Sequence, residues 1–257
     1  MLDTQLIRFN DIALMVNRGR GGGMINIARD SRLMASHLKQ SLQGKQCRQG
    51  LDIGCGTGIL ALTLAPFCDS VVAVDINPAA VEFTEKNIQL NHAKNIKVIN
   101  SNLFSEIGNK RFDIIVSNAV YDFHPDTLKP KESSLINYER GLRMPYKILE
   151  EAPAYLTETG ELHLICGSPI VGEDIVLGHL KKIRWGSVML VPVRYDILPE
   201  YYRFHKASSC SHFILYIVVV KKGKQGLEVK RMPWGSYLMN MLKMQLMVIS
   251  TYINRCD

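Results

Sequence analysis

The sequence predicts an α/β fold: a seven-stranded, mostly parallel sheet with helices on both faces and a last strand that runs antiparallel. Two observations predict it. From residue 49 onward, short apolar runs alternate with segments of helical length and period. A glycine-rich turn follows the first of these runs, and a carboxylate follows the second. Alternating strands and helices form parallel sheets because each connecting helix packs on a face of the sheet.

The candidate elements follow from these runs in chain order. Strands are expected at residues 50–53, 71–74, 97–99, 112–116, 161–166, 188–193 and 213–220. Helices are expected at residues 27–42, 58–66, 78–91, 143–155 and 173–183. No clear helix separates the last two strands, so the final strand is expected to insert antiparallel.

Three regions are expected along the chain. Residues 1–48 hold a glycine-rich insert at 19–23 and are interpreted as an N-terminal lid or substrate segment. Residues 49–222 form the α/β domain. Residues 223–257 are a Met-rich apolar extension that packs on the domain, covers a pocket or joins two copies of the chain as a homodimer.

Composition narrows the class of protein. The 257 residues are 47% hydrophobic and 21% charged, which is typical of a globular chain. No apolar stretch reaches the roughly 18 residues that span a bilayer, and the first ten residues lack the apolar core of a signal peptide. We therefore expect a cytoplasmic protein with no membrane contact. The six cysteines form no CxxC pair, so no metal site is expected.

The strongest motif is the run from Leu51 to Gly58, LDIGCGTG, which leads into an apolar helix. Its glycines permit a tight turn and let the backbone approach a ligand closely. Asp75 ends the second strand, 21 residues after Gly54. A carboxylate at that position can accept hydrogen bonds from both hydroxyls of a ribose.

NAD-binding domains share this acid and this spacing, but their loop reads GxGxxG. Here the glycines alternate after Asp52, which resembles motif I of class I S-adenosylmethionine-dependent methyltransferases. Residues 71–77 and 99–104 resemble that family's second and third motifs, and Asn102 stands where the family usually has Asp. The resemblance implies a Rossmann-like fold and S-adenosyl-L-methionine as cofactor. It implies these cofactor-binding residues: Asp52, Gly54, Cys55, Gly56, Gly58, Asp75, Ile76, Asn102, Leu103 and Asn118.

The tip of the fourth strand, Ser117 to Tyr121, resembles the Asn-Pro-Pro-Tyr motif of methyltransferases that act on planar nitrogens. In that motif, acceptor oxygens bind the two N–H groups and turn the nitrogen lone pair toward the methyl group. The resemblance implies that Asn118 and Tyr121 are catalytic. Ala119 and Val120 replace both prolines, so the restriction that proline places on φ is lost.

The segment from Ala28 to Met34 resembles the one that precedes motif I in the protein-glutamine N5-methyltransferase (release-factor methyltransferase) branch. Arg29 replaces an acid of that branch. The sequence thus favours an S-adenosylmethionine-dependent N-methyltransferase whose acceptor is a small molecule or a peptide or protein nitrogen. The net charge of +7 admits a nucleic-acid acceptor, but the basic residues are scattered, so this partner is less favoured.

Two alternatives stay open at this point. An altered loop permits attack on another carbon of the cofactor, which would transfer or cyclise the aminocarboxypropyl part and release methylthioadenosine. The chain could also be a non-catalytic protein that keeps the cofactor fold as a binding module.

Overall fold

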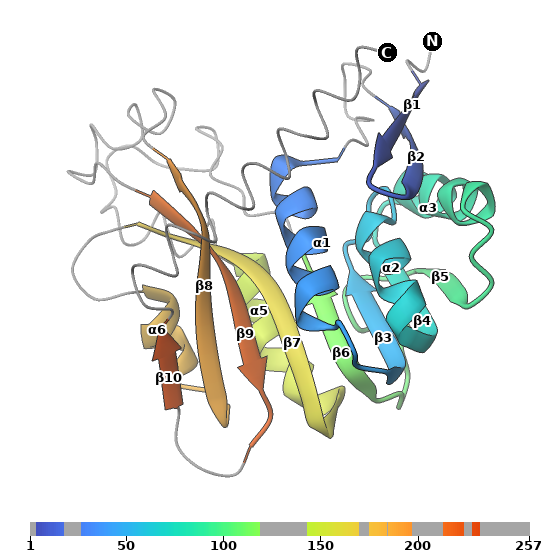
Figure 1. Cartoon of the computed structure of the whole chain (residues 1–257). Coiled ribbons are helices and arrows are strands. Elements are labelled where there is room, and N and C mark those ends of the chain that lie inside the picture. The colour runs from blue at the N-terminus through green and yellow to red at the C-terminus, as the bar shows by residue number, and fades with distance from the viewer. Residues whose placement is uncertain are drawn as a thin grey trace.

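The computed structural model describes residues 4–17, 27–118, 143–169, 175–183, 185–196, 213–223 and 228–231. Eight strands form one sheet in the order β10-β8-β9-β7-β6-β3-β4-β5 (Figure 1). The strands are β3 (Cys47–Ile53), β4 (Cys68–Asp75), β5 (Ile96–Asn100), β6 (Phe112–Ser117), β7 (Leu156–Pro169), β8 (Ser187–Asp196), β9 (Phe213–Lys221) and β10 (Glu228–Arg231).

The topology confirms the predicted fold class. All seven expected strands are present, and neighbours pair in parallel except around β9, which runs antiparallel to both β7 and β8. An eighth strand, β10, pairs in parallel with the outer edge of β8. It lies in the segment that the sequence assigned to the C-terminal extension, so the sheet continues beyond residue 222.

The helices occupy the predicted positions. They are α1 (Arg29–Ser41), α2 (Ile59–Leu64), α3 (Pro78–Leu90), α5 (Arg143–Glu151) and α6 (Ile175–Leu180). Short 3₁₀ turns, η1 (Ala65–Phe67) and η2 (Ala152–Ala154), follow α2 and α5. The start of α3 shows the local chemistry. Asn77 accepts a hydrogen bond from the amide of Ala79, and Pro78 occupies the first turn, where its missing N–H is not needed.

The sheet separates two apolar cores. Val71 and Ala73 of β4 face the core under α1 and α2, whereas Val72 and Val74 face the core that α5 and α6 cover. Successive residues of a strand point to opposite faces, so a strand covered on both sides is apolar throughout. Of the described helices, none has the length and apolar character to cross a membrane.

A separate two-stranded hairpin precedes the sheet. Its strands are β1 (Thr4–Phe9) and β2 (Ile12–Asn17), and they pair antiparallel with Phe9 opposite Ile12. Figure 1 shows the hairpin beside α2 and α3, and Leu14 and Val16 of β2 are buried in the same core as α1 and α2. These two strands were not predicted from the sequence.

Candidate functional site

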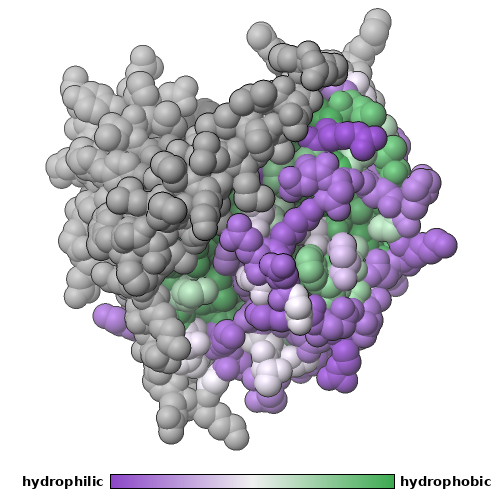
Figure 2. Space-filling model, in the orientation of Figure 1, coloured by the Kyte–Doolittle hydropathy of each residue, from purple (hydrophilic) through white to green (hydrophobic). Residues whose placement is uncertain are grey.

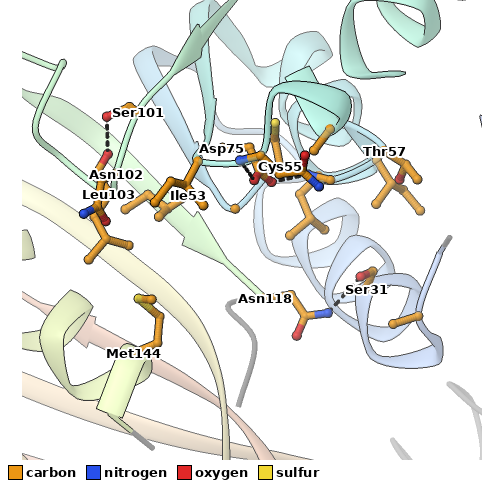
Figure 3. A pocket seen from close by; sticks show the side chains of 18 residues that line it. Ser31, Ile53, Cys55, Thr57, Asp75, Ser101, Asn102, Leu103, Asn118 and Met144 are labelled. Carbon is orange, nitrogen blue, oxygen red and sulfur yellow. Dashed lines mark hydrogen bonds between the residues drawn. The ribbon is translucent and has the colours of Figure 1, made fainter. Parts of the chain in front are cut away.

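A cavity of about 450 Å³ opens where β3, β4, β5 and β6 end. This volume lies within the roughly 300–1,000 Å³ of small-molecule sites, and the carboxyl ends of parallel strands are where open α/β sheets bind ligands. The lining comes from the start of α1, the glycine loop with the start of α2, the tip of β4 with the first turn of α3, the segment after β5, Asn118 after β6, and Met144 on α5 (Figure 3).

The glycine loop forms one wall of this cavity. Gly56 has φ of +55°, and a Cβ built there meets no atom within 4 Å, so its backbone is open to a ligand. Gly58 has φ of +77°, and a Cβ there would lie 2.9 Å from Cγ2 of Thr84 on α3. Gly56 therefore leaves room for a ligand, while Gly58 permits the close approach of α3 behind the loop.

Asp75 lies at the tip of β4 and faces the loop (Figure 3). Its carboxylate accepts hydrogen bonds from the amides of Gly56, at 3.0 Å, and Asn77, at 2.9 Å. Each carboxylate oxygen offers two acceptor positions, so capacity remains for hydroxyl donors from the cavity. The predicted ribose acceptor is therefore already fixed in place by backbone amides.

Asp52 has a different place from the one predicted. It is fully buried behind the loop and does not line the cavity. One carboxylate oxygen accepts a 2.9 Å hydrogen bond from the amide of Ala61, which ties the end of β3 to α2. Burial raises the pKa of Asp52 to about 7, the charge of Asp75 acts in the same direction, and the bond from Ala61 opposes them.

The other predicted cofactor residues lie around the cavity, except for Gly58. Gly54, Cys55, Ile76, Asn102 and Leu103 all line it. Burial raises the pKa of the Cys55 thiol, so this sulfur is held as a neutral group rather than a nucleophile. Ile76 is 65% exposed, so its apolar side chain stands at the mouth, where a flat ring could pack on it.

Asn118 stands directly after β6 and lines the cavity. Its Nδ2 donates a 2.8 Å hydrogen bond to the hydroxyl oxygen of Ser31 on α1, so its Oδ1 is turned away from Ser31 (Figure 3). In this arrangement the amide nitrogen faces α1 and the amide oxygen lies on the other side. Tyr121, the second predicted catalytic residue, lies outside the described residues, as do Ala119 and Val120.

Several lining residues were not predicted from the sequence, among them Ser31, Thr57, Ser101 and Met144. Ser31 belongs to the segment that resembles the glutamine methyltransferase branch, so that resemblance was the signal that could have found it. Across the described parts of the chain, no group of three or more His, Cys, Asp or Glu side chains is arranged to hold a metal ion. The absence of a metal stays a prediction.

Comparison with known proteins identifies the family. The pattern of the methyltransferase small domain matches residues 25–186, which is more than half of the chain. The chain belongs to the methyltransferase small domain family. This membership confirms the class I methyltransferase resemblance and S-adenosyl-L-methionine as the cofactor.

Two curated relatives carry the resemblance further. A release factor glutamine methyltransferase of Lactococcus lactis is 35% identical over 128 residues, which are 46% of this chain and 46% of that protein. A ribosomal RNA small subunit methyltransferase C of Hamiltonella defensa is 32% identical over 140 residues, 54% of this chain and 36% of that protein. The chain thus spans about half the length, or less, of these curated relatives.

A solved structure shares the fold. The 16S rRNA N2 G1207 methyltransferase of T. thermophilus, in complex with AdoMet and guanosine, superposes with a TM-score of 0.58 at 20% identity. The match covers 87% of this chain and 51% of that one.

The residues present fit S-adenosylmethionine. The open backbone at Gly54 and Gly56 leaves space that a Cβ would otherwise fill, and the amide-fixed carboxylate of Asp75 suits a ribose. Ile76 and Leu103 add apolar surface to the cavity lining, against which an adenine ring could pack. Asn102 adds a side-chain amide at the end of β5, where an adenine amino group could be bound.

Proposed function

We propose that this protein is an S-adenosylmethionine-dependent N-methyltransferase that acts on a planar nitrogen of a small molecule or of a peptide or protein. The observation that carries the proposal is the hydrogen bond from Nδ2 of Asn118 to Ser31. With Nδ2 engaged, the amide presents its oxygen, an acceptor, to the incoming group. An acceptor oxygen binds N–H or O–H donors and not the carbonyl or thioether groups of other substrates, and the names of the relatives favour N–H.

The chemistry follows from this orientation. S-adenosylmethionine, when bound, supplies an electrophilic methyl group. A planar nitrogen is a poor nucleophile because its lone pair is delocalised. Oδ1 of Asn118 accepts a hydrogen bond from one N–H of the acceptor and orients the nitrogen so that its lone pair points along the line of transfer. Positioning of this kind can contribute roughly 7–11 kcal/mol to lowering a barrier, so no strong base is required for the transfer itself. The N–CH3 bond forms as the S–CH3 bond breaks, S-adenosylhomocysteine is the leaving group, and the methylated nitrogen then loses its N–H proton to water.

The names of the relatives support a planar nitrogen. The Lactococcus lactis relative is named for glutamine, whose side chain is an amide, and the T. thermophilus enzyme is named for N2 of a guanosine. Both acceptors present flat N–H groups, although one is a protein and the other an RNA. We therefore propose a planar nitrogen as the acceptor atom, and we favour a peptide, a protein or a small molecule over RNA as the acceptor molecule.

The test is product analysis by mass spectrometry. Purified protein and S-adenosylmethionine are incubated in three separate reactions, with a small-metabolite extract, with glutamine-containing peptides, and with ribosomal RNA as the acceptor source. With the metabolite extract or the peptides, we expect one compound to be methylated on nitrogen, and S-adenosylhomocysteine to form in an amount equal to that product. Methylthioadenosine as the nucleoside product would overturn methyl transfer, and methylation confined to RNA would overturn the favoured acceptor.

Asn118→Ala tests the role of the amide. We expect kcat to fall roughly a hundredfold or more, the effect typical of losing one preorganised hydrogen bond in a site of this kind. S-adenosylmethionine affinity should change by less than tenfold. Ser31→Ala is the matched variant, since it keeps the amide oxygen but releases its orientation, and it should show a smaller loss of kcat. Unchanged turnover in a folded Asn118→Ala protein would remove Asn118 from the mechanism.

A further inference from the structure

The hairpin is held to the domain by two asparagines of α3. Oδ1 of Asn91 accepts from the amide of Ala13 at 2.9 Å, and its Nδ2 donates to the carbonyl of Ala13 at 2.6 Å. Asn87 binds the amide and carbonyl of Met15 in the same way, at 2.6 and 3.0 Å. An asparagine side chain carries the same donor and acceptor as a peptide group, so these two residues take the place of a third strand beside β2.

The spacing explains why this docking works. Four residues of α-helix rise about 6.0 Å, and two residues of β-strand rise about 6.6–6.8 Å. Asn87 and Asn91 are four residues apart on α3, and Met15 and Ala13 are two apart on β2, so both pairs meet in register. The amide and carbonyl groups of Ala13 and Met15 that would otherwise form an open strand edge are thereby satisfied.

Asn87 differs from Asn91 in one further contact. Its Nδ2 also donates a 2.8 Å hydrogen bond to the carbonyl of Thr57, and Asn87 itself is fully buried. Thr57 lies between Gly56 and Gly58 in the loop that forms the cavity wall. The additional bond of Asn91 goes instead to the carbonyl of Asn87 within α3. Asn87 alone of the two therefore joins the hairpin to the glycine loop.

One face of α3 continues this link. Ala80 lines the cavity, and Met15 of the hairpin packs against Ala80 and Phe83. Thr84 donates a 3.1 Å hydrogen bond to the carbonyl of Gly56. Positions 80, 84, 87 and 91 recur at helical spacing and thus share one side of α3. Along α3, this side contacts first the cavity, then the glycine loop, and finally the hairpin.

We propose that Asn87 is a positioning residue that makes the N-terminal hairpin part of the cofactor site: docking of β2 fixes the amide of Asn87, which in turn holds the carbonyl of Thr57 and the shape of the loop. The inference rests on the cofactor site proposed above. The outer strand β1 pairs with β2 and buries Ile7 and Phe9 in the core that α1 and α2 share. Figure 2 shows apolar and polar residues side by side at the upper right, where Figure 1 places the hairpin, and Leu6 of β1 is 61% exposed.

The experiment compares Asn87→Ala with Asn91→Ala. Both variants lose the two bonds to the hairpin, so both should lower the midpoint of urea unfolding. Only Asn87→Ala loses the bond to Thr57. By isothermal titration with S-adenosylmethionine, we expect its Kd to rise at least tenfold, and that of Asn91→Ala to stay within threefold of the wild-type value. Equal rises in the two variants would overturn the proposal, because the hairpin would then act through stability alone.

A second readout needs no ligand. Amide hydrogen exchange across residues 56–58 should be faster in Asn87→Ala than in the wild type and unchanged in Asn91→Ala. If Asn87→Ala fails to fold, Asn87→Leu replaces it and is compared with Asn91→Leu, since leucine has a similar volume but neither donor nor acceptor. Unaltered exchange would overturn the coupling. A wild-type protein that binds no S-adenosylmethionine would instead contradict the cofactor site, while the exchange data would still decide the coupling.

Discussion

At the scale of single residues, the carboxylate of Asp75 connects the loop to the expected ribose. It binds the amides of Gly56 and Asn77 and keeps acceptor capacity toward the cavity. In Asp75→Asn, the amide nitrogen would face one of these backbone donors, and one acceptor would be lost. Hydrogen bonds to charged groups contribute roughly 1.5–3 kcal/mol, so we expect the Kd for S-adenosylmethionine to rise about 10- to 100-fold in a titration.

Asp69→Asn is the control for this prediction. Asp69 accepts a 3.1 Å hydrogen bond from Gln46 at the exposed start of β4, at the other end of that strand from the cavity. An asparagine oxygen can accept the same bond, so affinity should be unchanged. If the two variants bound the cofactor equally well, Asp75 would not be the ribose acceptor.

A residue's role could be predicted from the sequence when it depends on neighbouring residues, and could not when it depends on partners distant in the sequence. The places of Gly56 and Asp75 at the cavity were predictable, because a turn glycine and a carboxylate at a strand tip are marked by local sequence alone; that they bind the cofactor stays a prediction. Asp52 was assigned to the cofactor, but its neighbour in the fold is the amide of Ala61. Asn87 could not be found, because its partners Met15 and Thr57 are 72 and 30 residues away and nothing local marks it as other than a helix residue.

At the scale of elements, a network of polar side chains connects α1 to β7. Nε2 of His37 lies 3.0 Å from Nδ1 of His163, and Nε2 of His163 lies 3.1 Å from Glu161. Lys221 of β9 pairs with Glu161 at 3.1 Å, and Lys45 lies 3.9 Å from it. Because α1 carries Ser31, this polar network also stabilises the helix that orients Asn118.

The buried His37 makes the stability of the folded protein depend on pH in the acid range. Burial lowers the pKa of His37 to about 3, the charge of His163 and that of Lys45 lower it further, and Glu161 opposes them. An unfolded histidine titrates near 6.5, so below that pH the unfolded state binds a proton that the folded state does not. Stability should therefore fall as pH drops from about 6.5 toward 3, by up to about 1.4 kcal/mol per pH unit.

His37→Gln tests this dependence, since a glutamine amide can still donate to His163 but does not titrate. The free energy of unfolding in urea should vary less between pH 5 and 6.5 than in the wild type. The pKa of Glu161 is raised by burial but lowered more by His163 and Lys221, to about 2, so its own loss of stability begins below about pH 4.5 and falls outside this window. His92→Asn, at an exposed position, should keep the wild-type slope. Equal slopes in all three proteins would contradict the assignment.

Helices and strands were predictable where the spacing of apolar residues in the sequence matches the faces that are buried in the fold. The seven expected strands are apolar runs, α3 carries one buried face, and α2 is buried at every position. Strand β2 is buried at Ile12–Leu14 and again at Val16–Asn17, so it lacks the alternation of a half-buried strand. Strand β10 reads EVKR, and a short charged strand at a sheet edge has no apolar signal to detect.

At the scale of the whole molecule, the cavity draws its lining from both sides of the fold and from segments between Ala28 and Met144. A ligand that contacts α1, the glycine loop, the tips of β4 and β5, and α5 should oppose unfolding of all of them together. The buried contacts behind the loop, from Asp52 to α2 and from Asn87 to the hairpin, carry this effect beyond the lining residues.

We therefore expect S-adenosylmethionine to stabilise the entire chain. At a free concentration of 100 times Kd, a ligand that binds only the folded state adds about 2.7 kcal/mol to the free energy of unfolding. For a chain of this size that corresponds to a rise in Tm of roughly 5–10 °C, measurable by calorimetry or dye-based melting. NAD should give no shift at equal concentration, because the alternating glycines and Cys55 do not form the GxGxxG cradle for a pyrophosphate. A shift with NAD and none with S-adenosylmethionine would reverse the assignment of the cavity.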